Sequence, residues 1–377
     1  MIKYIGSKRR LVPVLARICE SSGARTALDL FTGTTRVAQA FKTLGVHVTA
    51  VDSARYAHAF ARTYVEADAA TTDSGALRAA VAHLNSLPGK EGYVTETFSR
   101  QARFFQPHNA MRIDAARDAI DSAYAGSPLF PLLLTSLIEA ADRVDSTTGV
   151  QMAYVKEWAQ RSYNPLELRV PELLAGGGRA IRGDALELVH GPSLGHVDLA
   201  YLDPPYNQHR YFTNYHVWET LVAWDAPESY GVARKRVDAR DPATRSAFNS
   251  KRTMPAALAS VVAAVDCDLL VLSYNDESWL EPEELEVLCS AGGRRDVATL
   301  AFDSARYVGA RIGIFDPSGR KVGRVSHLSN RELLVIAGDP SMVRRVIGSL
   351  ESPPLASTRP SSMTVGAPRA DRLQQTT

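Results

Sequence analysis

The tetrapeptide Asp203-Pro204-Pro205-Tyr206 combines a carboxylate, a rigid backbone and an aromatic ring directly after an apolar run at 197–202. Two consecutive prolines fix two φ angles and remove two backbone N–H donors, so the carbonyl oxygens around them have few neighbouring donors. A carboxylate and fixed carbonyls are suited to accept hydrogen bonds from a ligand amine. Ligands of open α/β sheets lie beyond the carboxyl ends of the strands, where this tetrapeptide falls. The alternative is a proline-stiffened turn whose aspartate caps a helix.

A second segment with polar residues and a glycine spans 29–36 and reads Asp-Leu-Phe-Thr-Gly-Thr-Thr-Arg. Asp52 follows Asp29 by 23 positions, at the end of the next apolar run. An acidic side chain there can accept the ribose hydroxyls of a nucleoside. The three-glycine dinucleotide fingerprint is not present, which argues against NAD and ATP. A nucleoside cofactor without phosphates remains.

These residues need a sheet to position them, and the first part of the sequence predicts one. Leu11, Leu15 and Ile18 have helical spacing, and the run at 26–31 is typical of a buried strand. A second helical pattern over 37–44 ends at Gly45, before another apolar run at 46–52. This is a β-α-β unit, whose two strands should be parallel neighbours.

The rest of the chain divides by pattern. Residues 66–175 contain alanine-rich helical stretches and the apolar run 128–141, and we interpret them as a helical insertion. Extended runs resume at 197–202, 269–274 and 333–337. We expect a hairpin around Pro317-Ser318-Gly319, within 307–327, and a disordered tail at 351–377.

Composition bounds the class of protein. The 377 residues are 45% hydrophobic and 22% charged, which excludes disorder for most of the chain. No run approaches the roughly 20 apolar residues of a membrane helix, and the first residues lack the layout of a signal peptide, so we expect a soluble, intracellular protein. Three distant cysteines, Cys19, Cys267 and Cys289, suggest neither a disulfide framework nor a zinc site. A net charge of +2 is too small to indicate a polyanionic partner by itself.

Taken together, the motifs resemble those of the Dam-type DNA adenine N6-methyltransferases, which use S-adenosylmethionine. Residues 4–8 (Tyr-Ile-Gly-Ser-Lys) are similar to the family's N-terminal motif, 29–36 to its cofactor loop, 183–185 to the motif before the catalytic strand, and 203–206 to its catalytic DPPY motif. Thr34 departs from the family pattern, which has glycine there. The resemblance covers most of residues 1–338.

The resemblance implies a fold, domains and a site. The fold class is α/β, a Rossmann-like class I methyltransferase sheet with helices on both faces, formed by 1–65 and 176–350, with 66–175 as an inserted helical target-recognition domain. The implied catalytic residues are Asp203, Pro204, Pro205 and Tyr206. The implied cofactor-binding residues are Tyr4, Gly6, Lys8, Asp29, Phe31, Gly33, Thr34, Asp52, Asp184 and Asp203.

The expected reaction methylates the exocyclic amine of adenine. Asp203 and the carbonyl of Pro204 would each accept one N6 hydrogen, and Tyr206 would stack on the base. The adenine must first be flipped out of the duplex. We further expect Lys8 to pair with the cofactor carboxylate and Asp184 to accept a hydrogen bond from its adenine; a solvated lysine and a turn aspartate are the alternatives.

A basic segment at 234–252 is the candidate for contact with DNA phosphates, and a solvated basic loop is its alternative. The DNA-binding residues predicted from it are Arg234, Lys235, Arg236, Arg245, Asn249, Lys251 and Arg252. In the insertion, the residues that could face DNA are Arg100, Arg103, Phe104, Phe105, Lys156 and Arg161. Ordinary helix-surface charge over a core explains them equally well. We expect the insertion to read the DNA sequence.

Partners and alternatives follow from the same resemblance. We expect double-stranded DNA as partner, a cognate restriction endonuclease in a restriction-modification system, no membrane, a monomer or weak dimer, and a cytoplasmic, prokaryotic, nucleoid-associated location. Cytosine N4 methylation uses a similar amine and stays open, although Asp203 favours adenine by resemblance. A protein or RNA methyltransferase would usually have Asn at that position. A cofactor- and DNA-binding module without turnover is the alternative from another class.

Overall fold

The computed structural model describes residues 2–6, 8–155, 157–206, 208, 210–275, 278–305 and 329–351. The predicted hairpin at 307–327 lies outside these residues, as do Ser7 and Lys156. Glu351, the first residue of the predicted tail, ends a helix, and the rest of that tail is likewise outside the described residues.

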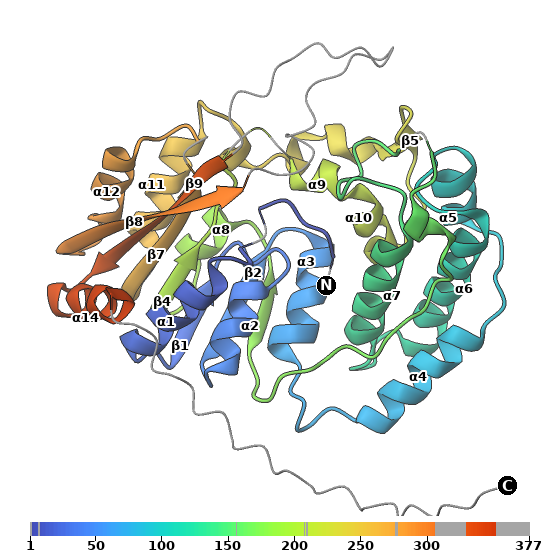
Figure 1. Ribbon diagram of the computed structural model, residues 1–377, viewed down its shortest axis with the longest axis horizontal. Helices are drawn as coiled ribbons and strands as arrows, with labels where there is room; N and C mark the ends of the chain where they lie inside the picture. Colours follow the sequence, from blue (N-terminus) through green and yellow to red (C-terminus); the bar gives the residue numbers. More distant parts are fainter. Residues whose placement is uncertain are drawn as a thin grey trace, which may run out of the picture.

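A seven-stranded sheet in the order β3-β2-β1-β4-β7-β9-β8 forms the left half of the molecule in Figure 1. Its strands are β1 (Thr26–Asp29), β2 (His47–Asp52), β3 (Arg179–Arg182), β4 (Val197–Leu202), β7 (Cys267–Asn275), β8 (Asp296–Ala305) and β9 (Ser329–Gly338). Neighbours from β3 to β7 are parallel, and β9 runs antiparallel to both β7 and β8. The predicted parallel pairing of β1 with β2 is confirmed.

Helices cover both faces of the sheet, as the predicted fold class requires. One face packs against α1 (Val12–Ser22), α2 (Arg36–Thr43) and α14 (Pro340–Glu351). The other packs against α8 (Ala185–His190), α11 (Met254–Ala264) and α12 (Pro282–Cys289). The central strand β4 is buried over its last four residues, because a parallel strand between two helical layers has no solvent face. The Rossmann-like α/β fold is therefore confirmed.

The residues between β2 and β3 form helices, in agreement with the helical character predicted for 66–175. These elements are α3 (Arg55–Ala61), η1 (Arg62–Glu66), α4 (Ser74–Ser86), α5 (Tyr93–Thr95), η2 (Glu96–Arg100), α6 (Pro107–Tyr124), α7 (Phe130–Val144) and η3 (Gln160–Tyr163). Local signals begin several of them: the Asp73 side chain caps α4, and prolines stand at the start of α6 and α7. The helices α4, α5, α6 and α7 occupy the right half of Figure 1.

The helical part shares its core with residues from other segments of the chain. Tyr56 and Phe60 of α3, and Trp218 and Leu221 of α10, belong to the same buried cluster as the apolar side chains of α4, α6 and α7. Figure 1 shows α3 between the sheet and these helices. Whether 66–175 is a domain in its own right stays a prediction.

A stretch of short elements connects β4 to β7 and lies over the carboxyl ends of the strands. It comprises α9 (Tyr211–Asn214), α10 (His216–Ala223), β5 (Ser229–Tyr230), β6 (Lys235–Arg236), η4 (Val237–Arg240), η5 (Pro242–Thr244) and η6 (Ala247–Asn249). The strands β5 and β6 form a small antiparallel pair separate from the main sheet. This connection contains most of the basic segment 234–252.

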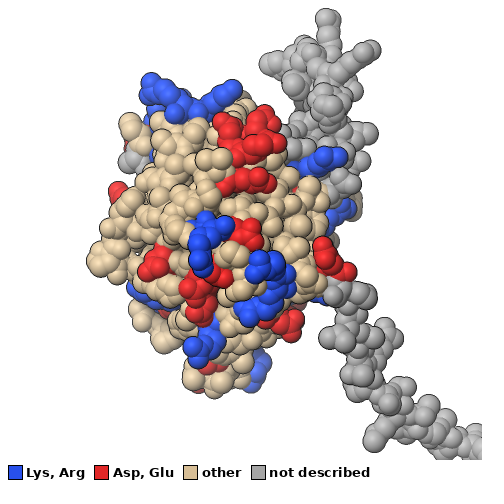
Figure 2. Space-filling model, turned by 90° about the vertical axis from the view of Figure 1, so that its left-hand side faces the viewer, with Lys and Arg blue, Asp and Glu red and all other residues tan. Residues whose placement is uncertain are grey.

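One side of the molecule has a surface of mixed charge. Figure 2 shows the side of the molecule at the β8 edge of the sheet, where acidic and basic side chains are interspersed. This side therefore offers no uniform positive surface to a polyanion.

Across the described residues, no helix has the length and apolar character needed to cross a membrane.

Candidate functional site

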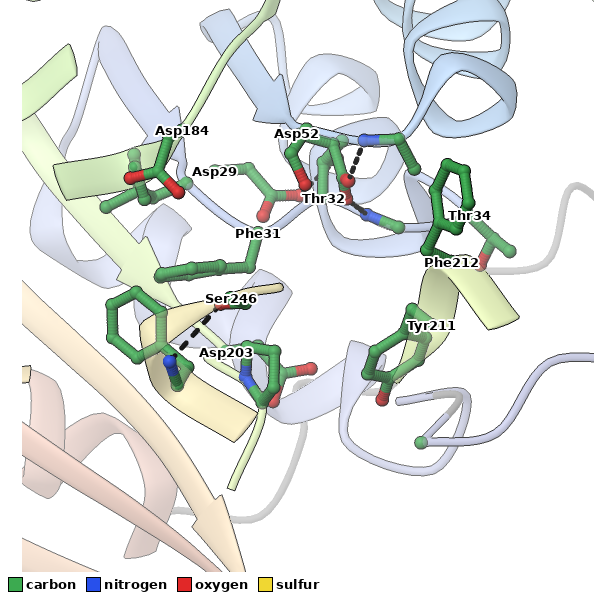
Figure 3. Close-up of a pocket in the computed structure, with 18 of the residues that line it drawn as sticks. Asp29, Phe31, Thr32, Thr34, Asp52, Asp184, Asp203, Tyr211, Phe212 and Ser246 are labelled. Carbon is green, nitrogen blue, oxygen red and sulfur yellow. Dashed lines mark hydrogen bonds between the residues drawn. The ribbon is translucent and has the colours of Figure 1, made fainter. Parts of the chain in front are cut away.

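A cavity of about 560 Å³ opens at the carboxyl ends of β1, β2 and β4. It lies where the chain order of the sheet reverses, between β1 and β4, which is the usual ligand site of open α/β sheets. All ten residues predicted to bind the cofactor line this cavity. Of the predicted catalytic residues, Asp203 and Pro205 line it as well. Figure 3 shows four carboxylates around the space, those of Asp29, Asp52, Asp184 and Asp203.

Asp29 ends β1 and holds the turn that follows. Its Oδ2 accepts hydrogen bonds from Thr32 Oγ1 at 2.8 Å and from the backbone N–H of Ala38 at 3.2 Å. Its Oδ1 is buried and has no hydrogen-bond partner among the described residues. Burial raises the pKa of Asp29 to about 7. A buried carboxylate oxygen without a donor favours a ligand that brings one, such as an ammonium group.

Gly33 and Tyr4 form one wall of the cavity. Gly33 has φ of +51°, and a Cβ at this position would lie 3.1 Å from Cε1 of Tyr4. The Tyr4 ring stacks against Tyr211 and Tyr215, with ring centroids 5.4 and 4.8 Å apart. Glycine is therefore needed for both the left-handed backbone and the close approach of the ring.

Thr34 occupies the position where the resembling family has glycine. Its own φ is not positive; the next residue, Thr35, takes the left-handed conformation with φ of 63°. The Thr35 hydroxyl donates to the carbonyl of Thr34 at 2.6 Å and accepts from Gln39 Nε2 at 2.8 Å. These local bonds hold the strained residue, so the threonine at 34 fits the turn without backbone strain of its own.

Asp52 ends β2 and points into the cavity with both oxygens hydrogen-bonded to backbone. Its Oδ2 accepts from Gly33 N and its Oδ1 from Ala54 N, both at 2.9 Å (Figure 3). Burial raises the pKa of Asp52, against the effect of these hydrogen bonds. Each carboxylate oxygen has a second lone pair, so the site can still accept ligand hydroxyls.

Asp184 and the ring of Phe31 form the opposite end of the cavity. Asp184 caps α8 by accepting the N–H of Leu186 at 2.8 Å, and it lines the cavity beside Gly183. Phe31 packs edge-to-face on Phe248, with ring centroids 5.1 Å apart. An apolar ring beside a carboxylate is suited to a heteroaromatic base, which offers a face for stacking and an amine for hydrogen bonding.

The DPPY tetrapeptide follows β4, as predicted. Asp203 is partly buried, and its Oδ1 lies 3.1 Å from Lys8 Nζ. Burial raises the pKa of Asp203 to about 6, although the Lys8 ammonium opposes this. Pro204 is buried, and the Tyr206 ring packs edge-to-face against Tyr274, with ring centroids 5.9 Å apart. Pro204 and Tyr206 do not line the cavity but lie next to residues that do.

Lys8 contacts two carboxylates of the protein itself. Besides Asp203, its Nζ lies 2.9 Å from Glu332 Oε2, and its side chain is 6% exposed. Although burial opposes the charged form, Asp203 and Glu332 raise the pKa of Lys8 well above its usual value. The expected pairing of Lys8 with the cofactor carboxylate stays a prediction.

The residues predicted from the basic segment 234–252 fall into three groups. Arg245 and Asn249 line the cavity. Arg236 is 2% exposed and forms ion pairs with Asp225 and Asp238, both at 2.7 Å. The prediction that Arg236 contacts DNA is therefore corrected, because a buried guanidinium held by two carboxylates cannot reach a phosphate. Arg234, Lys235, Lys251 and Arg252 do not line the cavity, and their contact with DNA stays a prediction.

In the helical part, the aromatic residues predicted as possible DNA contacts are core residues. Phe104 and Phe105 are each 1% exposed and belong to the shared hydrophobic cluster, which corrects that prediction. Arg100 is exposed and pairs with Glu91 and Glu96. Arg103 lies over the ring of Trp158, and Arg161 pairs with Asp145. Contact of these arginines with DNA stays a prediction.

Several residues of the cavity were not predicted from the sequence. They are Arg182, Arg210, Tyr211, Phe212, Glu219, Ser246 and Phe248. Glu219 is buried and its Oε1 accepts the N–H of Arg55 at 2.8 Å, at the start of α3. Burial raises the pKa of Glu219 to about 7. A glutamate at helical spacing among apolar residues gives no signal for such a role, because its partner lies 164 residues away in the chain.

Comparisons with known proteins agree with this geometry. Residues 4–288 match the family model described as D12 class N6 adenine-specific DNA methyltransferase. The chain is 29% identical to modification methylase StsI of Streptococcus sanguinis over 302 residues, which are 75% of this chain and 45% of that protein. It is 28% identical to type II methyltransferase M.NlaIII of Neisseria lactamica over 311 residues, 78% of this chain and 90% of that protein.

A third relative is type II methyltransferase M.FokI of Planomicrobium okeanokoites, 26% identical over 315 residues, 78% of this chain and 47% of that protein. The chain thus spans about half the length of the StsI and FokI enzymes and nearly all of the NlaIII enzyme. The matched residues include those that line the cavity and the DPPY tetrapeptide.

Proposed function

Because the chain belongs to the D12 class of N6 adenine-specific DNA methyltransferases, we propose that it methylates the N6 amine of an adenine in double-stranded DNA, with S-adenosylmethionine as the methyl donor. The observation that carries the proposal is the position of Asp203. It follows β4 directly and shares one cavity with the carboxylates of Asp29 and Asp52. A catalytic acceptor and a nucleoside site are thus adjacent.

The residues of the cavity fit this cofactor. The buried Oδ1 of Asp29, which has no donor among the described residues, would accept a hydrogen bond from the ammonium group of the methionine part. Asp52 would accept ribose hydroxyls, and Asp184 with Phe31 would bind the adenine. When bound, S-adenosylmethionine supplies an electrophilic methyl group on a positively charged sulfur.

The chain's own residues would prepare the target amine. Adenine N6 is a poor nucleophile because its lone pair is delocalised into the ring. Asp203 and the carbonyl of Pro204 would each accept one N6 hydrogen, which favours a pyramidal nitrogen with an available lone pair. The Asp203 carboxylate also stabilises the positive charge that develops on this nitrogen. The prolines hold both acceptors in place before the base arrives.

The target base must leave the duplex to reach Asp203, which costs a few kcal/mol. Stacking on Tyr206 would offset part of this cost. Arg245 and Asn249, which line the cavity, are the basic-segment residues placed to contact the flipped nucleotide or its phosphates. We assign the reading of the DNA sequence to the helical part, as a proposal.

The proposed setting follows from the relatives. The NlaIII and FokI enzymes are named type II methyltransferases. We propose by analogy that this protein acts in a restriction-modification system with a cognate endonuclease, in the cytoplasm close to the nucleoid, as a monomer or weak dimer.

The test uses the purified protein, a DNA library and isotope-labelled S-adenosylmethionine, followed by nucleoside analysis and modification mapping. We expect N6-methyladenine at one short sequence. Asp203→Ala should lose methylation while it retains cofactor and DNA binding, and Asp52→Ala should weaken cofactor binding. Label in N4-methylcytosine, or full turnover by Asp203→Ala, would contradict the proposal; absence of any transfer would favour a binding module.

A further inference from the structure

Asp203 shares its ammonium partner with a second carboxylate. Lys8 Nζ lies 3.1 Å from Asp203 Oδ1 and 2.9 Å from Glu332 Oε2. The side chains of Lys8, Asp203 and Glu332 are 6%, 18% and 13% exposed, so solvent screens this cluster only weakly. Two negative charges and one positive charge leave a net charge of −1 beside the catalytic tetrapeptide.

Three segments distant in sequence bring this cluster together. Lys8 lies in the N-terminal loop before α1, Asp203 follows β4, and Glu332 lies on β9. Glu332 stands opposite Asn275 in the register of β7 and β9, and Asn275 Nδ2 donates to Glu332 Oε1 at 3.2 Å. Both oxygens of Glu332 are therefore engaged, and its position is fixed by the sheet.

We propose that Lys8 and Glu332 are positioning residues for methyl transfer: Lys8 holds one oxygen of Asp203 so that the other accepts the target amine, and Glu332 keeps the cluster negative. The inference rests on the proposed function and extends it to two residues that do not touch the reacting atoms. A lysine alone would neutralise Asp203. The second carboxylate restores a negative charge that can stabilise the positive charge developing on the nitrogen.

Of the other groups around Asp203, the tyrosines carry no charge at neutral pH, whereas Asp29 ionises there because burial raises its pKa to about 7. Tyr201 of β4 is buried and Tyr211 of α9 is partly buried; the loss of solvent raises the pKa of each hydroxyl well above its usual value and keeps both neutral. The Tyr206 ring lies 5.8 Å from Lys8 Nζ. Asp29 of β1 is the other carboxyl whose charge interacts with Asp203. Among the described residues, Lys8 is the cation that contacts Asp203.

The two residues should shift the ionisation of Asp203 in opposite directions. Removal of the ammonium in Lys8→Met leaves two unpaired carboxylates, so the pKa of Asp203 rises from about 6. Removal of the neighbouring negative charge in Glu332→Gln lowers it. Because only ionised Asp203 offers both oxygens as acceptors, one to the Lys8 ammonium and the other to the amine, the acidic limb of the pH–rate profile should follow these changes.

The experiment measures single-turnover methyl transfer to DNA between pH 5.5 and 9, at saturating cofactor and DNA, relative to the unmodified protein at each pH. Lys8→Met should lose about tenfold at pH 7, the result of a pKa increase of about two units, and recover toward pH 9. Lys8→Arg, the matched control that keeps the charge, should retain the original limb. Glu332→Gln should move the limb to lower pH and reduce the plateau rate.

A second readout needs no activity. In protein labelled with ¹³C at the aspartate carboxyl carbons, Asp203→Asn identifies the resonance, and its titration gives the pKa in each variant. Opposite shifts without any methyl transfer would support the cluster and refute the proposed function. If methyl transfer occurs but Lys8→Met and Lys8→Arg lower the rate equally at all pH values, the inference is overturned. If Lys8→Met does not fold, Glu332→Gln alone tests the inference. An acidic limb of the pH–rate profile that does not move in Glu332→Gln would then contradict it.

Discussion

Four of the carboxylates that line the cavity differ in their partners. Asp203 has the ammonium of Lys8, whereas Asp52 accepts two backbone N–H groups and Asp184 one. Asp29 keeps one oxygen without a donor among the described residues. Burial disfavours ionisation and raises the pKa values of Asp29, Asp52 and Asp203, and neighbouring carboxylates add to this effect for Asp29 and Asp203. The oxygen of Asp29 that has no donor favours a ligand group that brings one.

The pH dependence of cofactor binding should report on Asp29. Burial raises its pKa to about 7 in the free protein, so the protonated form predominates below this pH. The cofactor's ammonium binds the ionised form, so the Kd should fall as the pH rises through the pKa. Between pH 5.5 and 7, where that ammonium stays protonated, we expect about tenfold tighter binding, measured by calorimetry. Asp29→Asn should bind weakly with little change over this range; an equal pH dependence in the variant would contradict the assignment.

The stability of the protein without cofactor should depend on the ionisation of Asp29 in the opposite direction to cofactor binding. A carboxyl whose pKa is higher in the folded protein binds its proton more tightly there than in the unfolded chain. Asp29 therefore contributes most favourably below the unfolded pKa near 4, and this contribution is lost as the pH rises toward 7. In Asp29→Asn, the free energy of unfolding without ligand should depend less on pH across this window, which urea unfolding at pH 5 and pH 8 will show.

Gly33→Ala tests the close approach of Tyr4. The added Cβ would meet the Tyr4 ring at 3.1 Å while φ remains at +51°. We expect a loss of about 1–2 kcal/mol in the free energy of unfolding from the left-handed backbone, together with weaker cofactor binding. Gly195→Ala is the matched control, because nothing lies within 4 Å of its Cβ position and its φ is not positive. Equal behaviour of the two variants in urea unfolding would contradict the prediction.

At the scale of elements, the β5–β6 pair is anchored by a buried arginine. Arg236 of β6 donates to Asp225, which follows α10, and to Asp238 of η4. It therefore connects three elements that lie over the cavity. The neighbouring η5 leads to Arg245, whose position in the cavity depends on this anchored segment. Adjacent basic residues thus have different roles, one inside the fold and one facing the ligand.

A pair of variants separates these roles. Arg236→Ala removes a buried ion-pair network, and we expect a loss of about 2 kcal/mol in the free energy of unfolding. Arg245→Ala should leave stability unchanged but weaken DNA binding and reduce the slope of log K against log salt by about one. Urea unfolding and salt-dependent DNA titrations measure the two effects. The reverse pattern would show that both roles are assigned to the wrong residues.

The sequence predicts elements best where burial is complete. The central strands β1, β2, β4, β7 and β9 all coincide with predicted apolar runs, because strands between two helical layers have no polar face. The strands β3 and β8 were not predicted. Each lies at an edge of the sheet, and β3 reads Arg-Ala-Ile-Arg with no buried residue. Edge strands need little apolar sequence, so their signal is weak.

The residues of the site likewise divide into those that the sequence predicts and those that it does not. Asp29, Asp52 and Asp203 were predictable because each ends a strand, and strand ends converge on one edge of a parallel sheet. Glu219 and Tyr211 could not be predicted, because α9 and α10 reach the cavity only through tertiary packing. The error for Arg236 has the same origin: charge is visible in the sequence, but its burial against Asp225 is not.

For the whole molecule, the shared core couples the helical part to the sheet. Tyr56 and Phe60 of α3 and Trp218 of α10 pack in one cluster with side chains of α6 and α7. Removal of residues 66–175 would expose these large side chains to water. The helical part therefore helps to stabilise α3 and α10, which carry Tyr56 and Glu219, in addition to any role in reading DNA.

This coupling makes a prediction for chimeras. A swap of 66–175 with a relative should transfer target specificity only if the faces of α3 and α10 that contact the insertion are exchanged with it. Modification mapping of both chimeras measures the specificity, and urea unfolding measures their stability. We expect the simple swap to be destabilised by several kcal/mol, because mismatched core side chains leave cavities or overlap. Full stability of the simple swap would show that the helical part folds independently.

The position of β9 has a consequence for synthesis in the cell. This strand lies between β7 and β8 in the sheet but follows both in the chain. On the ribosome, β8 emerges before the strand that will join it to the sheet, and Glu332 is translated long after Lys8 and Asp203. A nascent chain that ends before β9 therefore has an incomplete sheet and lacks one member of the proposed Lys8–Asp203–Glu332 cluster, so we expect methylation to begin only once translation has passed β9.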